Sequence, residues 1–205
     1  MKGLFISRFC PIFKNMMKRY FRKALAPIVI AAHLAMAPNA FAVKEDIILD
    51  DLFATLQEVQ DQGDVARIVS EIWSRWSTHP EDESITSRLN RGVTMMNQGD
   101  YVHAEALFTD IIALDPDFAE AWNKRATLYY IQGNLAASRA DIAQTLALEP
   151  RHFGALSGLG LIELSYGRYD EALRAYEQAA AVNPHMAQAN EMIKSLKEKL
   201  RGIAL

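Results

Sequence analysis

The sequence predicts an all-α fold, a short solenoid of repeated helix pairs. Three dipeptides that end in proline are each separated from the next by 34 residues: Asp115-Pro116, Glu149-Pro150 and Asn183-Pro184. Three glycines keep the same period: Gly99, Gly133 and Gly167. No stretch alternates apolar and polar residues over the length of a strand. A fixed period of this length is typical of solenoids in which each repeat is one helix pair.

Three further series share this register and indicate how the helices pack. Each unit has a small residue at its eighth position (Gly92, Ala126, Gly160), another at its twentieth (Ala104, Ser138, Ala172) and a large one at its twenty-fourth (Phe108, Ile142, Tyr176). We expect the small residues to face each other across a helix pair and the large one to fill the gap to the next unit. Glycine permits a positive φ in the turn, and proline ends the second helix. The units are 85–118, 119–152 and 153–186.

The middle unit resembles the tetratricopeptide repeat (TPR) family. That family's pattern of W, G/A, Y, G, A, F and P is met here by Trp122, Ala126, Tyr129, Gly133, Ser138, Ile142 and Pro150. The chain departs from the pattern at four positions: Arg88 replaces the tryptophan of unit one, Arg91 and Arg125 replace a leucine, and Glu163 takes an aromatic position. The resemblance implies a right-handed solenoid that binds proteins.

Helical segments are expected on both sides of the repeats. Residues 43–84 look like a degenerate helix pair followed by a linker, and the apolar edge formed by Ile72, Trp73 and Trp76 is expected to cap the solenoid. Residues 187–205 predict a capping helix, because their apolar residues fall on one face and their lysines on the other.

Residues 1–42 read as a secretory signal peptide. They hold seven of the 22 basic residues and none of the 25 acidic ones, so residues 43–205 carry 15 basic and 25 acidic residues. Basic residues precede the apolar stretch 24–38, and Ala40-Phe41-Ala42 is a small-residue cleavage pattern. We therefore expect cleavage after Ala42 and a periplasmic protein without a stable membrane anchor. A start at Met16 or Met17 would give a signal of ordinary length, which would make residues 1–15 a start-codon artefact.

The sequence contains no pattern that indicates catalysis, a metal or a cofactor. Phosphate-loop, nucleophile-elbow, zinc-protease and dinucleotide motifs are all missing. The only cysteine, Cys10, lies in the leader. The later histidines share no spacing suited to a metal, and we expect those near the repeat prolines to be solvated: His79, His152 and His185. The acidic balance of residues 43–205 argues against nucleic acid.

A partner-binding groove is predicted from the resemblance, which places the groove on one face of each unit's first helix. The residues carried over to that face are Leu89, Val93, Met96, Asn123, Thr127, Tyr130, Ser157 and Leu161. The alternative is that the N-terminal helices cover some of the apolar ones. A secondary polar patch comprises Asn90, Arg91, Lys124 and Arg125, which either meets an acidic partner or pairs with the protein's own carboxylates. The carboxylate clamp of chaperone-binding TPR domains is absent, because Leu89 and Val93 occupy two of its positions.

These observations predict a non-catalytic periplasmic scaffold or adaptor that serves the assembly or maintenance of cell-envelope complexes. Its partner is a protein or peptide, laid in the groove as a helix or an extended segment. Two alternatives remain at this point. One is an accessory module of an envelope enzyme, or an enzyme that uses Glu163. The structural account of Glu163 is that it reaches solvent or pairs with an arginine such as Arg125. The other is a membrane-surface protein that acts through Trp73 and Trp76.

Overall fold

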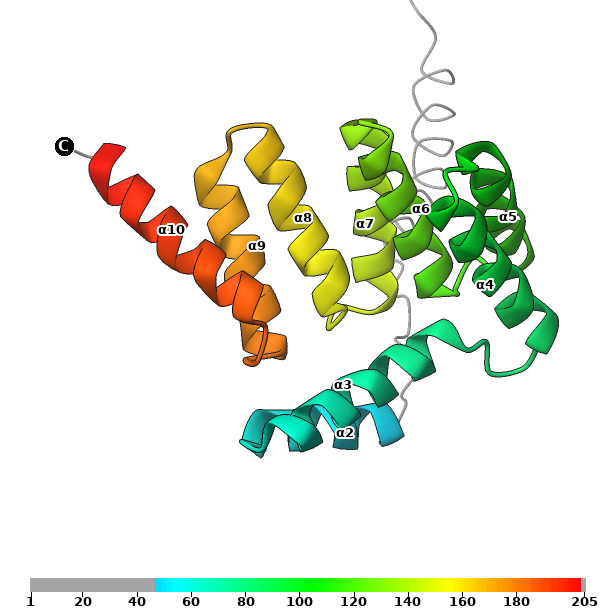
Figure 1. Ribbon diagram of the computed structural model, residues 1–205, viewed down its shortest axis with the longest axis horizontal. Coiled ribbons are helices and arrows are strands. Elements are labelled where there is room, and N and C mark those ends of the chain that lie inside the picture. The colour runs from blue at the N-terminus through cyan, green and yellow to red at the C-terminus, as the bar shows by residue number, and fades with distance from the viewer. Residues whose placement is uncertain (1–46, 204–205) are drawn as a thin grey trace, which may run out of the picture. The chain divides into compact units, whose positions relative to one another are not determined.

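The computed structural model describes residues 47–203, and this range contains nine helices and no strand (Figure 1). The all-α prediction is therefore confirmed for the part of the chain that is described. The predicted signal peptide and its cleavage site after Ala42 lie outside these residues.

Three helix pairs follow one another along the chain and form the solenoid. They are α4 (Glu83–Asn97) with α5 (Tyr101–Leu114), α6 (Ala119–Ile131) with α7 (Leu135–Leu148), and α8 (Phe153–Ser165) with α9 (Tyr169–Val182). Each helix packs on its neighbours in sequence. The turns within the pairs contain Gly99, Gly133 and Gly167, whose φ angles are 82°, 76° and 71°. An L side chain would be strained there, so the predicted role of these glycines is confirmed.

Small residues at the eighth position let the helices of a pair approach closely. A Cβ atom on Gly92 would lie 2.5 Å from Phe108 Cε1, and one on the equivalent glycine of the third pair would lie 2.7 Å from the Tyr176 ring. In the middle pair, Ser138 Oγ donates a 2.7 Å hydrogen bond to the carbonyl oxygen of Ala126. The large residue at the twenty-fourth position therefore fills space within its own pair as well as towards the next unit, where Phe108 joins a core that reaches α6.

The last helix, α10 (Ala187–Ile203), covers the C-terminal end of the solenoid. Ala189 and Leu196 are buried against α9. On the more exposed side of α10, Lys197 Nζ lies 2.7 Å from Glu177 Oε1, and Lys199 lies over the ring of Tyr169. This arrangement is that of a one-sided helix that closes a repeat array.

The N-terminal pair, α2 (Ile47–Glu58) and α3 (Gln62–Ser77), does not extend the solenoid as another unit. Its core joins the apolar face of both helices to Phe153 at the start of α8 and to partly buried residues of the α9–α10 region. The ring of Trp76 stacks on His152 with centroids 4.1 Å apart, and Trp73 meets the same imidazole edge-on. The apolar edge predicted for α3 is thus buried, but it covers the beginning of α8 and not the end of the repeat array.

Two sets of hydrogen bonds fasten this pair to the far end of the third unit. Gln57 Nε2 donates to the carbonyl oxygens of Ala181 and Val182, which end α9. His185 Nε2 lies 3.0 Å from the carbonyl oxygen of Leu56, in the last turn of α2. Each helix terminus thereby provides an acceptor for a side chain of the other segment, and these carbonyls would otherwise have no partner in their own helix.

The position of the N-terminal pair explains two departures from the repeat pattern. Arg88 and Arg91 occupy positions that in a longer array would pack on a preceding unit. Both are exposed, since α2 and α3 pack elsewhere. At the equivalent position of the next unit, Trp122 packs against the core shared by α4, α5 and α6. The arginines therefore stand at a free end of the solenoid, where a charged side chain costs little.

Candidate functional site: a groove between the second and third repeats

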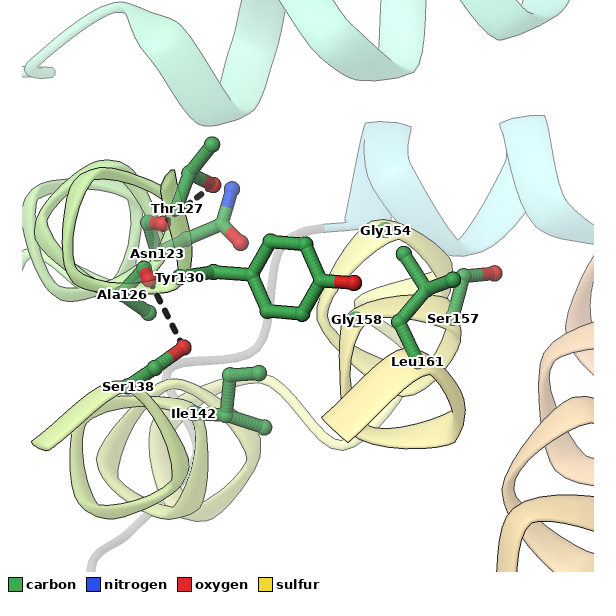
Figure 2. Close-up of a pocket in the computed structure, with 10 residues that line it drawn as sticks. All are labelled: Asn123, Ala126, Thr127, Tyr130, Ser138, Ile142, Gly154, Ser157, Gly158 and Leu161. Carbon is green, nitrogen blue, oxygen red and sulfur yellow. Dashed lines mark hydrogen bonds between the residues drawn. The ribbon is translucent and has the colours of Figure 1, made fainter. Parts of the chain in front are cut away.

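A pocket of about 200 Å³ lies between α6, α7 and α8 (Figure 2). Its lining contains five of the predicted groove residues, which are Asn123, Thr127, Tyr130, Ser157 and Leu161. The remaining lining residues are Ala126, Ser138, Ile142, Gly154 and Gly158. The structure thus brings together all the groove residues that were predicted from the second and third units.

Helical spacing explains why these side chains share one surface. On α6, Asn123, Thr127 and Tyr130 are separated by four and three residues, which places them on one face of the helix. On α8, Ser157 and Leu161 are four residues apart. Figure 2 shows the Tyr130 ring reaching from α6 towards α8, across the space between the two helices.

The first unit contributes nothing to this pocket. Leu89 is only 1% exposed and belongs to the core formed by α4, α5 and α6. Val93 and Met96 are partly buried and pack against the same core. Leu89 is therefore a core residue and not a groove residue. It is covered by the neighbouring repeat helices rather than by the N-terminal pair.

The lining of the pocket is uncharged, and several of its polar groups are already engaged. Thr127 Oγ1 donates to the carbonyl oxygen of Asn123, and Asn123 Nδ2 donates to Glu120 Oε2 at 2.8 Å. The buried hydroxyl of Ser157 has no hydrogen-bond partner among the described residues. A surface of this kind suits an apolar group flanked by groups that can form hydrogen bonds.

A buried polar network supports the groove at the end nearest the N-terminal pair. Glu120 accepts the hydrogen bond from Asn123, and its carboxylate also meets His152 Nε2 at 2.9 Å and Lys124 Nζ at 2.7 Å. Burial, the largest influence, raises the pKa of Glu120, but the hydrogen bond from His152 and the charge of Lys124 outweigh it. The pKa of Glu120 is held below its ordinary value. Because Glu120 is charged and paired, it orients Asn123 towards the groove.

The prediction of solvated loop histidines is wrong. His152 is fully buried, and its Nδ1 accepts a hydrogen bond from the backbone N–H of Ala155 at the start of α8. His79 behaves similarly, since its Nδ1 accepts from the N–H of Asp82 and its Nε2 lies 2.8 Å from Asp115 Oδ2. Each imidazole accepts a backbone N–H through Nδ1 and faces a carboxylate through Nε2. His152 is the N-cap of α8, whereas His79 binds the loop before α4, whose N-cap is Asp82. Their positions beside the repeat prolines are therefore structural.

Two of the four residues of the secondary polar patch are paired with the protein's own carboxylates. Lys124 binds Glu120, and Arg125 makes two hydrogen bonds to the carboxylate of Asp141, at 2.7 and 2.9 Å. Asn90 and Arg91 are exposed on α4. Of the two readings of this patch, pairing with the protein's own carboxylates holds for both members from α6.

Glu163 is buried in a double ion pair, although not with Arg125. Its oxygens lie 2.6 Å from Arg139 Nε and 3.1 Å from Arg168 Nη1. Burial raises the pKa of Glu163, but the hydrogen bonds from the two arginines outweigh it and leave the pKa below its ordinary value. A carboxylate that stays charged and fully paired lacks the raised pKa of a general acid. The expected role of Arg125 here is therefore replaced by that of Arg139 and Arg168.

The described residues show neither a metal-binding cluster nor a membrane-spanning helix. Across residues 47–203, no three His, Cys, Asp or Glu side chains gather as metal ligands would. In the same range, no helix combines the length and the apolar character needed to cross a bilayer.

Comparison with known proteins identifies the repeat. The tetratricopeptide repeat profile matches residues 89–151, 125–184 and 158–192. The chain belongs to the TPR family. A TPR repeat-containing protein of Rhizobium etli is 36% identical over 161 residues, which cover 75% of each chain. Tetratricopeptide repeat protein 36 of Mus musculus is 31% identical over 128 residues, covering 55% of this chain and 69% of that protein.

Solved TPR structures share the fold of this chain. The first TPR domain of Spaghetti (RPAP3), bound to an HSP90 peptide, matches 60% of this chain and 98% of that domain, with a TM-score of 0.56 and 21% identity. The Yersinia enterocolitica type III secretion chaperone SycD, in complex with a peptide of the translocator YopD, matches 58% of this chain and 96% of that protein. Its TM-score is 0.54 and its identity 12%. TPR proteins generally mediate protein–protein interaction, including peptide binding.

Proposed function

We propose that this TPR protein is a non-catalytic adaptor of the periplasm that binds a peptide segment of a partner in the groove between α6 and α8. In that role it serves the assembly or maintenance of cell-envelope complexes. The observation that carries the proposal is the uncharged pocket in which Tyr130 of one repeat faces Gly158 and Leu161 of the next (Figure 2).

The size of the pocket suits one side chain of a partner. An apolar cavity of about 150 Å³ is large enough to bind benzene. A pocket of about 200 Å³ therefore accommodates a phenyl ring or a large aliphatic side chain. The hydroxyl group of Tyr130, which reaches towards α8 (Figure 2), is then available for a hydrogen bond to the backbone of the bound segment, a division of roles common in peptide grooves.

The absence of a clamp separates this groove from those that hold a terminal carboxylate. Leu89 and Val93 belong to or pack against the core of the first unit. Lys124 and Arg125 are engaged with carboxylates of their own repeat. An internal apolar segment of the partner is thus a better ligand than an acidic C-terminus.

Export is proposed from the sequence. The basic, acid-free leader and the Ala40-Phe41-Ala42 pattern support secretion and cleavage after Ala42. The proposal is tested by isolating the protein from the periplasm and determining its mass and first residue. Val43 is the expected N-terminus, whereas an intact leader on a cytoplasmic protein would refute export.

Neither alternative function gains support from the described residues. Glu163 is neutralised by two arginines, which removes the reason to suspect catalysis there. Trp73 and Trp76 are packed against His152 and Phe153, so they are engaged within the protein and not displayed to a membrane.

The groove is tested by capture of periplasmic proteins on immobilised residues 43–205. We expect Tyr130→Ala to lose the partner, and Tyr166→Ala to keep it. Tyr166 is the matched control, since it is 42% exposed in the turn after α8 and does not line the pocket. Circular dichroism of both variants verifies that the helices persist. Equal capture by the two variants would place the binding surface outside this groove.

A further inference from the structure

A second cavity lies where the N-terminal helix pair meets the loops that precede α6 and α8. Its volume is about 460 Å³. It shares no residue with the groove. Its lining comes from α2, the end of α3 and its following loop, the start of α6, and the α7–α8 loop: Ile47, Ile48, Arg75, Trp76, Thr78, Pro80, Asp117, Phe118, Ala119, Glu120 and Glu149.

The wall of this cavity contains a buried donor that lacks an acceptor. Trp76 is only 8% exposed, and its ring is fixed by stacking on His152. Its indole Nε1–H has no hydrogen-bond partner among residues 47–203. Buried polar groups are nearly always paired in folded proteins. Because Trp76 lines the cavity, its unpaired indole N–H leaves an acceptor missing beside the cavity.

Carboxylates outnumber cations in the lining of the cavity, so an anion is disfavoured as the missing acceptor. Glu120 is paired with Lys124 and accepts a hydrogen bond from His152 Nε2, and Glu149 Oε1 accepts from the backbone and side chain of Arg151. Together with Asp117, the lining has three carboxylates and one cation. An anionic acceptor would be repelled by this set, whereas a carbonyl would not.

The mouth of the cavity is apolar and exposed. Ile47 and Ile48 are 70% and 54% exposed, and Phe118 and Pro80 add apolar surface to the lining. Large aliphatic side chains that are exposed beside a cavity favour an apolar ligand. The ligand must therefore combine aliphatic groups with an adjoining uncharged acceptor, and a peptide backbone with apolar side chains meets both requirements.

We propose that this cavity is a second peptide site, which holds an apolar segment through its side chains and through a backbone carbonyl that accepts a hydrogen bond from Trp76 Nε1. The site lies outside the repeat groove and is formed only because α2 and α3 fold back onto the later repeats. The site extends the proposed adaptor function. A partner with one segment in the groove and another in this cavity would be bound at two positions.

The test is a titration of ¹⁵N-labelled residues 43–205 with N-acetyl-leucyl-leucine amide, observed at the indole N–H resonances. The chain has three tryptophans, which Trp→Phe variants assign. We expect the Trp76 resonance to move downfield and saturate. The Trp122 resonance should stay in place, since its Nε1 already donates to Pro116 O at 2.9 Å. A Trp76 resonance that does not respond would overturn the proposal.

Further ligands separate the chemical classes. 4-Methylpentanoate, which carries a charge, is expected to bind at least tenfold more weakly than the dipeptide amide. Octanamide tests for a free amphiphile. If octanamide saturates the Trp76 resonance and the dipeptide amide does not, the site takes small amphiphiles and the peptide proposal fails.

Matched variants complete the test. Trp76→Phe and Ile47→Ser are each expected to weaken binding of the dipeptide amide at least tenfold. Val102→Ser is the control, because Val102 is similarly exposed on α5 and does not line the cavity. Ile47→Ser alters an exposed side chain, so it tests the site even if Trp76→Phe fails to fold. The Tyr130→Ala variant should bind the dipeptide amide with the affinity of the wild type. A failure of this site can therefore be distinguished from a failure of the groove. Equal affinity of Ile47→Ser and Val102→Ser would contradict the proposal.

Discussion

Individual glycines determine whether the N-terminal helix pair can dock. A Cβ atom on Gly154 would lie 2.6 Å from Trp73 Cη2, and Gly154 also lines the groove. The Trp73 ring is itself enclosed by Trp76, His152 and Phe153, so it has little room to yield.

We expect Gly154→Ala to lower the free energy of unfolding by about 1–3 kcal/mol, the usual cost of overpacking. Gly202→Ala is the control, because nothing lies within 4 Å of the added atom. Alanine favours the helix by about 1 kcal/mol over glycine, so the control should be neutral or stabilising. Urea denaturation measures both, and a stabilised Gly154→Ala would show that Trp73 does not pack as described.

The stabilisation that Glu163 contributes to the fold depends on pH. Its pKa in the folded protein is below the ordinary value of 4.5, because Arg139 and Arg168 bind the carboxylate. The stabilisation is therefore fully present above about pH 4.5 and is lost as the pH falls through the folded pKa.

Glu163→Gln should be less stable than the wild type at neutral pH, and the gap should narrow at about pH 3.5. The measurement is the free energy of unfolding of both proteins at the two pH values. If the two proteins differ in free energy of unfolding by the same amount at both pH values, the ion pairs of Glu163 do not contribute to stability.

Residue roles could be predicted from the sequence where they repeat and not where they are unique. The turn glycines recur every 34 residues, and their positive φ followed from that period. His152 has no equivalent in the other units. Its partners are Trp76 from α3 and Glu120 from α6. Nothing in the linear sequence links these three positions.

At the scale of helices, the same repeat position has different roles in different units. Arg88 and Trp122 both stand fourth in their units. Arg88 is exposed at the free end of the solenoid, while Trp122 packs on the core and donates a hydrogen bond to Pro116.

We expect Arg88→Ala to change stability by about 0.5 kcal/mol or less. Trp122→Ala should cost about 3 kcal/mol, at the lower end for truncation of a tryptophan because the ring is half-buried. Thermal and urea unfolding of the two variants provide the comparison. A large loss in Arg88→Ala would indicate that another element covers α4.

The helices themselves could be predicted, but the placement of α2 and α3 could not. One-sided apolar patterns and capping residues are local signals, so the sequence indicated a helix pair before the repeats. Its docking surface is assembled from Phe153 of α8, Val182 of α9 and Met186 of the loop before α10. Such a surface exists only after the third repeat has folded.

At the scale of the whole molecule, α10 is expected to be required for solubility. Truncation before Ala187 would uncover Tyr176 and Ala172, which are 2% and 0% exposed beneath this helix. Repeat arrays without a polar-backed end expose their inter-repeat surface.

We therefore expect residues 43–186 to aggregate or to unfold at lower urea concentration than residues 43–205. Size-exclusion chromatography and binding of a hydrophobic dye measure the difference. A monomeric, equally stable truncated protein would show that α10 is dispensable.

The residues predicted for the groove from the second and third units line the pocket, whereas Leu89 of the first unit lies in the core. The carried-over pattern places Leu89 on the same face as Asn123 and Ser157, and the face is indeed shared. At the end of an array, however, the core of the first unit closes over that residue. The repeat pattern determines the helix face on which a residue lies, whereas the exposure of that residue depends on which elements pack against the face.

The hydrogen bonds that join Gln57 to the end of α9, and His185 to the end of α2, span 124 to 129 residues of sequence. Contacts in a repeat array are otherwise local, and such arrays fold rapidly and can fray from their ends. Here most of the solenoid must form before these bonds can close, which raises the contact order and slows the final step of folding. Once closed, they join the beginning of the described chain to the third repeat, so that fraying at the N-terminal end also disrupts the end of α9. The protein should therefore lose its structure in fewer, more cooperative steps than an open array of the same length.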